Sequence, residues 1–163
     1  MEGNEYKNEI LEITKDLLSK VGFNGDVKLV ESDSGANKFA TVSVESDGDL
    51  SMLIGKCGQN LYAFEHLVRL IAARRMKDQI SSLNFIIDVN DYRRSRTDYL
   101  ADLAKSTAQR VIQTGKAEAL SPMNSYERKV VHMELASFKE VQTESIGQEP
   151  RRRVIIKPQS SDL

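Results

Sequence analysis

The chain has 163 residues, of which 40% are hydrophobic and 29% charged, and its formal net charge is −1. This length fits one ordinary domain or two small ones. The sequence has no run of eighteen apolar residues to span a membrane, and its first twenty residues lack the apolar core of a secretory signal. One cysteine excludes an internal disulfide, and with only two histidines it excludes the usual zinc sites. We therefore expect a cytoplasmic protein with no metal and no cofactor.

The near-neutral total is an average over two unlike halves. Residues 1–90 hold ten basic and fourteen acidic residues, a net charge of −4, and residues 91–163 hold thirteen basic and ten acidic residues, a net charge of +3. The basic residues of the second half gather at 93–96 and at 151–157. These clusters are interpreted either as two solvated charged faces or as two parts of one anion-binding surface.

Hydrophobic periodicity predicts the elements of the first half. Helical spacing predicts a helix over residues 5–21, including Val21 and ended by Gly22. Alternation of apolar and polar residues predicts three strands, at 26–31, 39–45 and 83–89. Residues 32–37 have the composition of a hairpin loop. A short apolar segment, 50–54, precedes a longer helix that ends in Arg74, Arg75 and Lys77 and has an apolar stripe of Leu61, Phe64, Leu67, Val68, Ile71 and Ala72.

The second half opens on a long helix. Asp91 is the predicted cap, Gly115 ends the helix, and the buried stripe is predicted to be Leu100, Leu103, Ala104, Ala108, Val111 and Ile112. Residues 124–127 match a capping box, because a cap residue is followed three positions later by glutamate. The helix that it starts carries Val131, Leu135 and Phe138, and short strands are predicted at 117–120, 141–145 and 153–157.

The resulting order, α-β-β-α-α-β followed by α-β-α-β-β, predicts an α+β protein of two small domains. Their boundaries are 1–90 and 91–158, and residues 159–163 are predicted to be a disordered tail. Only about four residues, 89–92, separate the halves, and no linker rich in proline, glycine or serine lies between them. We therefore expect the two halves to be held close together.

Two glycines three positions apart, Gly55 and Gly58, are a weak signal alone and a stronger one in their context. They lie between a short apolar helix and a longer amphipathic one, with two strands before them and one after. A sharp glycine turn lets a backbone approach closely, and the amide groups at the start of the next helix favour an anion. Lys56 adds a positive charge at the apex. Such a turn can clamp a sugar-phosphate backbone, or it can be a helix-to-helix turn without a ligand.

The segment LIGKCGQNLYAFEHLV resembles the centre of a KH domain, and the helix and strand ahead of it resemble the type II arrangement, with a three-stranded sheet packed by helices. This resemblance implies a loop that grips single-stranded RNA or, less often, DNA. The implied contact residues are Ile54 under the bases, Gly55, Lys56, Cys57 and Gly58 in the loop, and Gln59 and Asn60 at the start of the helix.

Cys57 departs from the usual pattern, in which both residues between the glycines are polar or basic. A catalytic or redox role needs a partner, and His66 lies nine residues further on. We interpret Cys57 as a tolerated small residue and His66 as a surface or packing residue. No catalytic residue is predicted.

Arg128 and His132 are four positions apart on the second capped helix and are expected to share an exposed face. The pair is either a phosphate contact or a solvated face. The stretches YRRSR, LSPMNSYERKVVH and ESIGQEPRRRVIIKP resemble the small nucleic-acid-binding domain named for Arg-x-x-x-His, the R-three-H domain. The resemblance implies binding by Arg128 and His132, with Lys129, Arg152 and Arg153 as auxiliary cations.

A type II KH domain followed by an R-three-H domain resembles the bacterial Jag family, also called KhpB or SpoIIIJ-associated, over residues 5–158. The resemblance implies a post-transcriptional regulator or RNA chaperone of single-stranded RNA, linked to cell elongation, division and envelope physiology, with a small KH-only protein as partner. Many members carry a further N-terminal domain, so this chain is a short form or a fragment.

Two surfaces joined by a short connection predict two-site binding of RNA that weakens with salt. An alternative is an interaction module that docks on a small KH protein or on membrane-insertion machinery, with incidental RNA or DNA binding. The acidic first half favours this alternative. An enzyme is not expected, because no nucleotide-binding loop or catalytic grouping has recognisable spacing.

Overall fold

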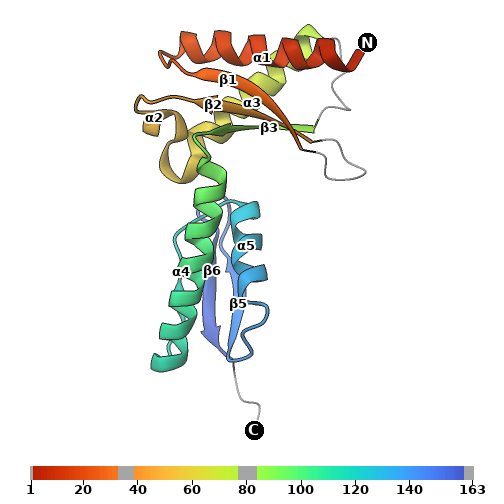
Figure 1. Cartoon of the computed structure of the whole chain (residues 1–163). Helices are drawn as coiled ribbons and strands as arrows, with labels where there is room; N and C mark the ends of the chain where they lie inside the picture. The colour runs from red at the N-terminus through yellow and green to blue at the C-terminus, as the bar shows by residue number, and fades with distance from the viewer. Residues whose placement is uncertain (1, 33–38, 77–83, 160–163) are drawn as a thin grey trace. The chain divides into compact units, whose positions relative to one another are not determined.

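The computed structural model describes residues 2–32, 39–76 and 84–159, and the chain divides into two compact units, Met1–Arg93 and Arg94–Leu163 (Figure 1). In chain order the first unit contains α1 (Glu2–Lys20), β1 (Asp26–Ser32), β2 (Phe39–Glu45), α2 (Ser51–Ile54), the 3-10 turn η1 (Lys56–Gly58), α3 (Gln59–Arg75) and β3 (Asn84–Val89). Helix α4 (Tyr92–Thr114) begins in the first unit and continues into the second, which also contains β4 (Glu118–Ala119), α5 (Ser125–Leu135), β5 (Val141–Ile146) and β6 (Arg153–Pro158).

The sheet of the first unit has the order β1-β2-β3. Strands β1 and β2 are antiparallel, whereas β2 and β3 are parallel, and Val42 lies opposite both Leu29 and Ile87. A parallel pair needs a long crossover, and here α2 and α3 lie in it. This crossover places the turn at Gly55–Gly58 between two helices.

The core of the first unit lies between the sheet and helices α1 and α3. Alternate strand residues point into it, as the period of two requires. The helices contribute residues three, four or seven positions apart, which is the spacing of one helix face. The buried side chains include Ile10, Ile13, Val42, Val44, Leu61, Phe64, Val68, Phe85 and Ile87.

The second unit packs α4 and α5 on an antiparallel sheet of order β4-β6-β5. Its buried side chains include Leu100, Ala104, Ala108, Val111, Val131, Leu135, Val154 and Ile156. The predicted capping box of α5 is confirmed: the Glu127 amide donates to Asn124 Oδ1 at 2.9 Å, and the Asn124 amide donates to Glu127 Oε2 at 3.0 Å. Gly115 follows α4 with a φ of 67°, as a helix-ending glycine should.

Several of the local predictions are wrong. Leu67 and Ile112 were expected in apolar stripes and are 47% and 43% exposed. Val21, 46% exposed, lies just beyond α1, which ends at Lys20, and Phe138 lies beyond α5, which ends at Leu135. Leu67 and Ile112 are each next to a buried valine, and one helical residue turns 100°, so they lie at the edge of the stripe. Asp91, with a φ of 56°, precedes α4, but the carboxylate that accepts from the first-turn amide of Arg93 is Asp88, at 3.1 Å.

Four predictions lie partly or wholly outside the described residues. They are the hairpin loop at 32–37, the helix end at Lys77, the start of the strand at 83–89 and the tail at 159–163. Of the tail, the structure describes Gln159, whose amide donates to the Glu140 carbonyl at 2.8 Å. The α+β class itself is confirmed, with helices and small sheets in both units.

Candidate nucleic-acid interface

The turn between α2 and α3 is built on left-handed backbone angles. Gly55, Cys57 and Gly58 have φ values of 69°, 53° and 77°. A Cβ on Gly55 would lie 2.5 Å from Asn60 Cγ, so a larger residue would force the Asn60 side chain to move. The Asn60 amide nitrogen donates to the Met52 carbonyl at 2.7 Å, which ties the start of α3 to α2. Asn60, which is exposed and predicted to contact nucleic acid, therefore also holds the turn together.

Gly58 is buried against two tyrosines. A Cβ there would lie 2.9 Å from Tyr92 Cε1 and 3.2 Å from Tyr62 Cε2. The Arg93 guanidinium lies over the Tyr62 ring, 4.8 Å from its centroid. Since Tyr92 and Arg93 are the first residues of α4, the start of that helix supports the turn.

The outer side of the turn presents the other predicted residues. Lys56 and Gln59 are exposed, whereas Ile54 and Cys57 are half-buried. Among the described residues, Lys56 has no ion-pair partner. Cys57 is a free thiol, and His66 is exposed on α3. An anion that approaches this turn therefore meets one unneutralised charge, on Lys56.

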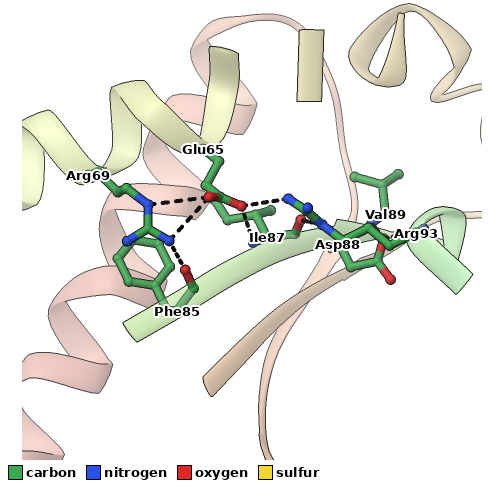
Figure 2. A network of polar contacts seen from close by, with 7 residues as sticks. All are labelled: Glu65, Arg69, Phe85, Ile87, Asp88, Val89 and Arg93. Carbon is green, nitrogen blue, oxygen red and sulfur yellow. Dashed lines mark hydrogen bonds and ion pairs between the residues drawn. The ribbon is translucent and has the colours of Figure 1, made fainter. Parts of the chain in front are cut away.

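Behind the turn, Glu65 joins α3, β3 and α4 in one polar network (Figure 2). Its Oε2 accepts from the Ile87 amide at 3.0 Å and from Arg93 Nη2 at 2.6 Å, and its Oε1 accepts from Arg69 at 3.1 Å. Arg69 and Arg93 also donate to the carbonyls of Phe85 and Ile87. These side chains occupy backbone groups of the edge strand β3, so the network closes that edge to a further strand.

In the second unit, the Arg-x-x-x-His pair is not an exposed pair. Arg128 is only 7% exposed, and its Nη1 donates to the Met123 carbonyl at 2.7 Å and pairs with Glu149 Oε1 at 2.8 Å. His132 is partly buried, with Nδ1 2.6 Å from Thr143 Oγ1 and Nε2 2.8 Å from Ser145 Oγ. The expectation of an exposed face is wrong for Arg128, because the Glu149 carboxylate and a backbone carbonyl lie against its guanidinium.

Burial lowers the pKa of His132 below its usual value of 6.5, and the nearby Arg128 charge lowers it further. The neutral ring suits its two hydroxyl partners, since one nitrogen donates a hydrogen bond and the other accepts one.

The depressed pKa of His132 predicts a loss of stability in acid. Well above pH 6.5 neither state binds a proton at this histidine, and as the pH falls through 6.5 the unfolded state gains a proton that the folded state resists. The free energy of unfolding of the second unit should therefore be lower at pH 5.5 than at pH 7.5. Urea titrations at both pH values measure this loss, and His132→Gln should remove it while His66→Gln should not. If both variants lose the same unfolding free energy in acid, His132 is not the cause of the pH dependence.

The two basic clusters are partly neutralised. Arg96 Nε pairs with the buried Glu127 at 2.7 Å, and Lys157 pairs with Glu144, so these two cations serve the fold. Arg153 is half-buried, and its Nε donates to the Arg151 carbonyl at 3.4 Å. The exposed cations of the second unit without an ion-pair partner among the described residues include Arg94, Lys129, Arg151 and Arg152.

Comparison with known proteins places these two units in a family. A family model for the R-three-H domain matches residues 98–158. Proteins named RNA-binding protein KhpB from Lactiplantibacillus plantarum, Clostridium symbiosum and Bacillus subtilis are 39%, 40% and 37% identical to the chain. The alignments cover 74%, 73% and 65% of the chain and 36%, 52% and 50% of these relatives. The chain belongs to the KhpB family. It spans about half the length, or less, of the curated relatives that it matches.

Sequence reasoning missed two residues that shape the surfaces of this KhpB-family chain. Tyr92 packs on Gly58 although 34 positions separate them, and Glu149 pairs with Arg128 across 21 positions. No periodicity or local motif links residues so far apart, and only the fold brings them together.

The described part of this KhpB-family chain holds neither a metal cluster nor a membrane-spanning helix. Within residues 2–32, 39–76 and 84–159, no group of three or more His, Cys, Asp and Glu side chains could hold a metal ion. None of the helices in these ranges has the length and apolarity that a bilayer crossing requires.

Proposed function

We propose that this chain binds single-stranded RNA, without catalysing a reaction, through the Gly55–Gly58 turn and through the R-three-H unit. The curated relatives carry the name RNA-binding protein. The observation that carries the proposal is Lys56, an exposed cation at the apex of a left-handed turn, without an ion-pair partner among the described residues. Residues 1–90 have a net charge of −4, so Lys56 is a local positive site on an otherwise acidic half of the chain.

The first domain, residues 1–90, is proposed to be a type II KH domain. The order α-β-β-α-α-β and the parallel pairing of β2 with β3 support this proposal. The short α2 and the longer α3 flank the turn, as a loop that clamps a backbone requires. Gly55, Lys56, Cys57 and Gln59 are proposed to face the phosphates, with Ile54 beside the bases. The buried Gly58 is proposed to give the loop its shape.

The second domain, residues 91–158, is proposed to bind through cations around the start of α5. The Met123 amide donates to the Arg152 carbonyl at 3.1 Å, which brings Arg152 to that end of the helix. Arg128 is proposed to contact a phosphate only after its partner Glu149, whose side chain is 59% exposed, gives way. An RNA phosphate is a natural replacement, because it offers the guanidinium the same acceptor oxygens as a carboxylate. His132 and Arg153 are proposed to act mainly by positioning β5 and β6.

The wider role proposed is post-transcriptional regulation or RNA-chaperone activity, linked to cell elongation, division and envelope physiology. Its support is the family alone, and a small KH-only protein is the partner that the family implies. Since the chain spans only part of its curated relatives, this role concerns the part that they share.

Binding should depend strongly on salt. A strand that meets Lys56, Lys129, Arg151 and Arg152 neutralises about four phosphates, and at about 0.7 per contact the slope of log K against log salt is about −3. The affinity should therefore fall about 50-fold between 50 and 200 mM salt. Fluorescence anisotropy of labelled single-stranded RNA measures it, with duplex RNA and single-stranded DNA as comparisons. The absence of binding at low salt would overturn the proposal.

The second candidate is a protein-docking module, and two exposed leucines favour it. Leu67 and Leu70 are 47% and 53% exposed on α3, which gives the acidic unit an apolar stripe. Light scattering and the ratio of absorbance at 260 and 280 nm separate the candidates. Purified protein that is dimeric and free of nucleic acid would favour docking, and co-purified RNA on a monomer would favour the first proposal.

A further inference from the structure

The outer face of α5 carries a shallow hollow of about 410 Å³, which is within the usual range of small-ligand sites. Its lining comes from one helix face, because the residues follow the spacing of three and four: Tyr126, Lys129, Val130, Met133 and Glu134. Tyr126 and Met133 are 59% and 67% exposed. Arg128 and His132 take part in the contacts with Glu149 and β5 described above and do not line the hollow.

The charges around this hollow favour an anion at one side of it. Lys129 is exposed and has no ion-pair partner among the described residues. Glu134, the acidic residue in the lining, pairs with Lys105 at 2.8 Å. The lining therefore combines an exposed aromatic ring, a flexible thioether and one unneutralised cation.

We propose that this hollow holds one unstacked nucleobase of single-stranded RNA, with its ring on Tyr126 and Met133 and a neighbouring phosphate on Lys129. The inference rests on the proposed RNA-binding function and adds a base-stacking site to the second unit. Stacking on a tyrosine accepts any base, since every base has a π-face. The site therefore contributes affinity with little sequence preference.

A nucleobase fits this surface better than a protein does. A stable protein interface takes about 20–30 residues a side, and this hollow is lined by five side chains of one helix. The centre of a protein interface is also poor in lysine, whereas a phosphate next to a stacked base needs such a cation. The hollow on α5 is thus large enough for one base and its phosphate.

The chain has no tryptophan, so Tyr126→Trp introduces a single fluorescent reporter at the proposed site. Titration with single-stranded oligouridine should quench this fluorescence, and an oligomer of the same length without bases should quench it much less. Tyr99→Trp is the matched control, because Tyr99 is 55% exposed on α4 in the same unit and lies outside the hollow. Equal quenching by both oligomers, or equal quenching in both variants, would overturn the stacking site.

Affinity supplies a second readout. Tyr126→Ala should weaken RNA binding by about fivefold or more, whereas Tyr126→Phe keeps the ring and should bind like the wild type. If the wild type binds RNA and Tyr126→Ala binds it equally well, this inference fails alone. If the wild type does not bind RNA, the proposed function fails with it. If the wild type is a dimer that Tyr126→Ala dissociates, and the RNA affinity is unchanged, the outer face of α5 binds a second copy of this chain instead of a base.

Discussion

The variant Lys56→Asp/Cys57→Asp is expected to bind single-stranded RNA at least about tenfold more weakly than the wild type. The two substitutions remove the exposed cation of the turn and add two negative charges where a phosphate is proposed to lie. The turn then repels the RNA backbone instead of attracting it. Fluorescence anisotropy at low salt, where the electrostatic contribution is largest, measures the change.

The double variant should keep its fold. Lys56 is exposed, and no ion pair among the described residues depends on it. Cys57 has a φ of 53°, and aspartate is among the residues that tolerate this left-handed region best after glycine. Neither glycine of the turn is changed, so Asn60 can still close it against Met52. Circular dichroism and the urea midpoint should therefore match those of the wild type.

A matched control separates the turn from the overall charge. Lys15→Asp/Ser19→Asp makes the same change in net charge on the exposed side of α1. It lowers long-range attraction as much as the turn variant does but leaves the turn intact. RNA affinity should therefore fall much less. If both double variants lose affinity equally, the Gly55–Gly58 turn is not the binding site, and the proposal for the first unit is wrong.

The parts of the fold that the sequence predicts well are those that depend on neighbouring residues. Asn124 and Glu127 form the capping box that their spacing predicts, and Gly115 ends α4. The strands follow from alternation, because burial of one sheet face imposes a period of two. The glycine turn is also predictable, since only small or left-handed-tolerant residues fit between two helices that meet so closely.

The candidate site is predicted less well, because charge depends on partners that lie far away in the sequence. The cluster at 93–96 resembles one basic patch in the sequence, but Arg93 pairs with Glu65 and Arg96 with Glu127. Arg128 was expected to be exposed and is held by Glu149. A count of lysines and arginines cannot show which of them a carboxylate neutralises, and only those left unpaired attract RNA at long range.

Glu65→Ala is expected to destabilise the first unit by about 2–3 kcal/mol. The Glu65 side chain is 14% exposed, and it neutralises Arg69 and Arg93 while it accepts from the Ile87 amide. Its removal takes the carboxylate partner from two partly buried guanidinium groups, which keep only other contacts such as those to the carbonyls of Phe85 and Ile87. It also takes the acceptor from the Ile87 amide of β3. Such a loss exceeds that of a surface ion pair, because the remaining charges stay shielded from water.

Urea unfolding measures the global loss, and hydrogen exchange at the Ile87 amide reports on the network itself. Asp16→Ala is the control, since it breaks an exposed i,i+4 pair with Lys20 and should cost less than about 1 kcal/mol. Glu65→Gln keeps an oxygen for the Ile87 amide, so its loss of stability should lie between those of Glu65→Ala and Asp16→Ala.

Because Arg93 directly follows Tyr92 in the chain, loss of Glu65 also loosens the packing of Tyr92 against Gly58. Glu65→Ala should therefore weaken RNA binding, even though removal of a negative charge would by itself favour the binding of RNA phosphates. If the variant binds RNA more tightly than the wild type, the charge of Glu65 affects binding more than its support of the turn does.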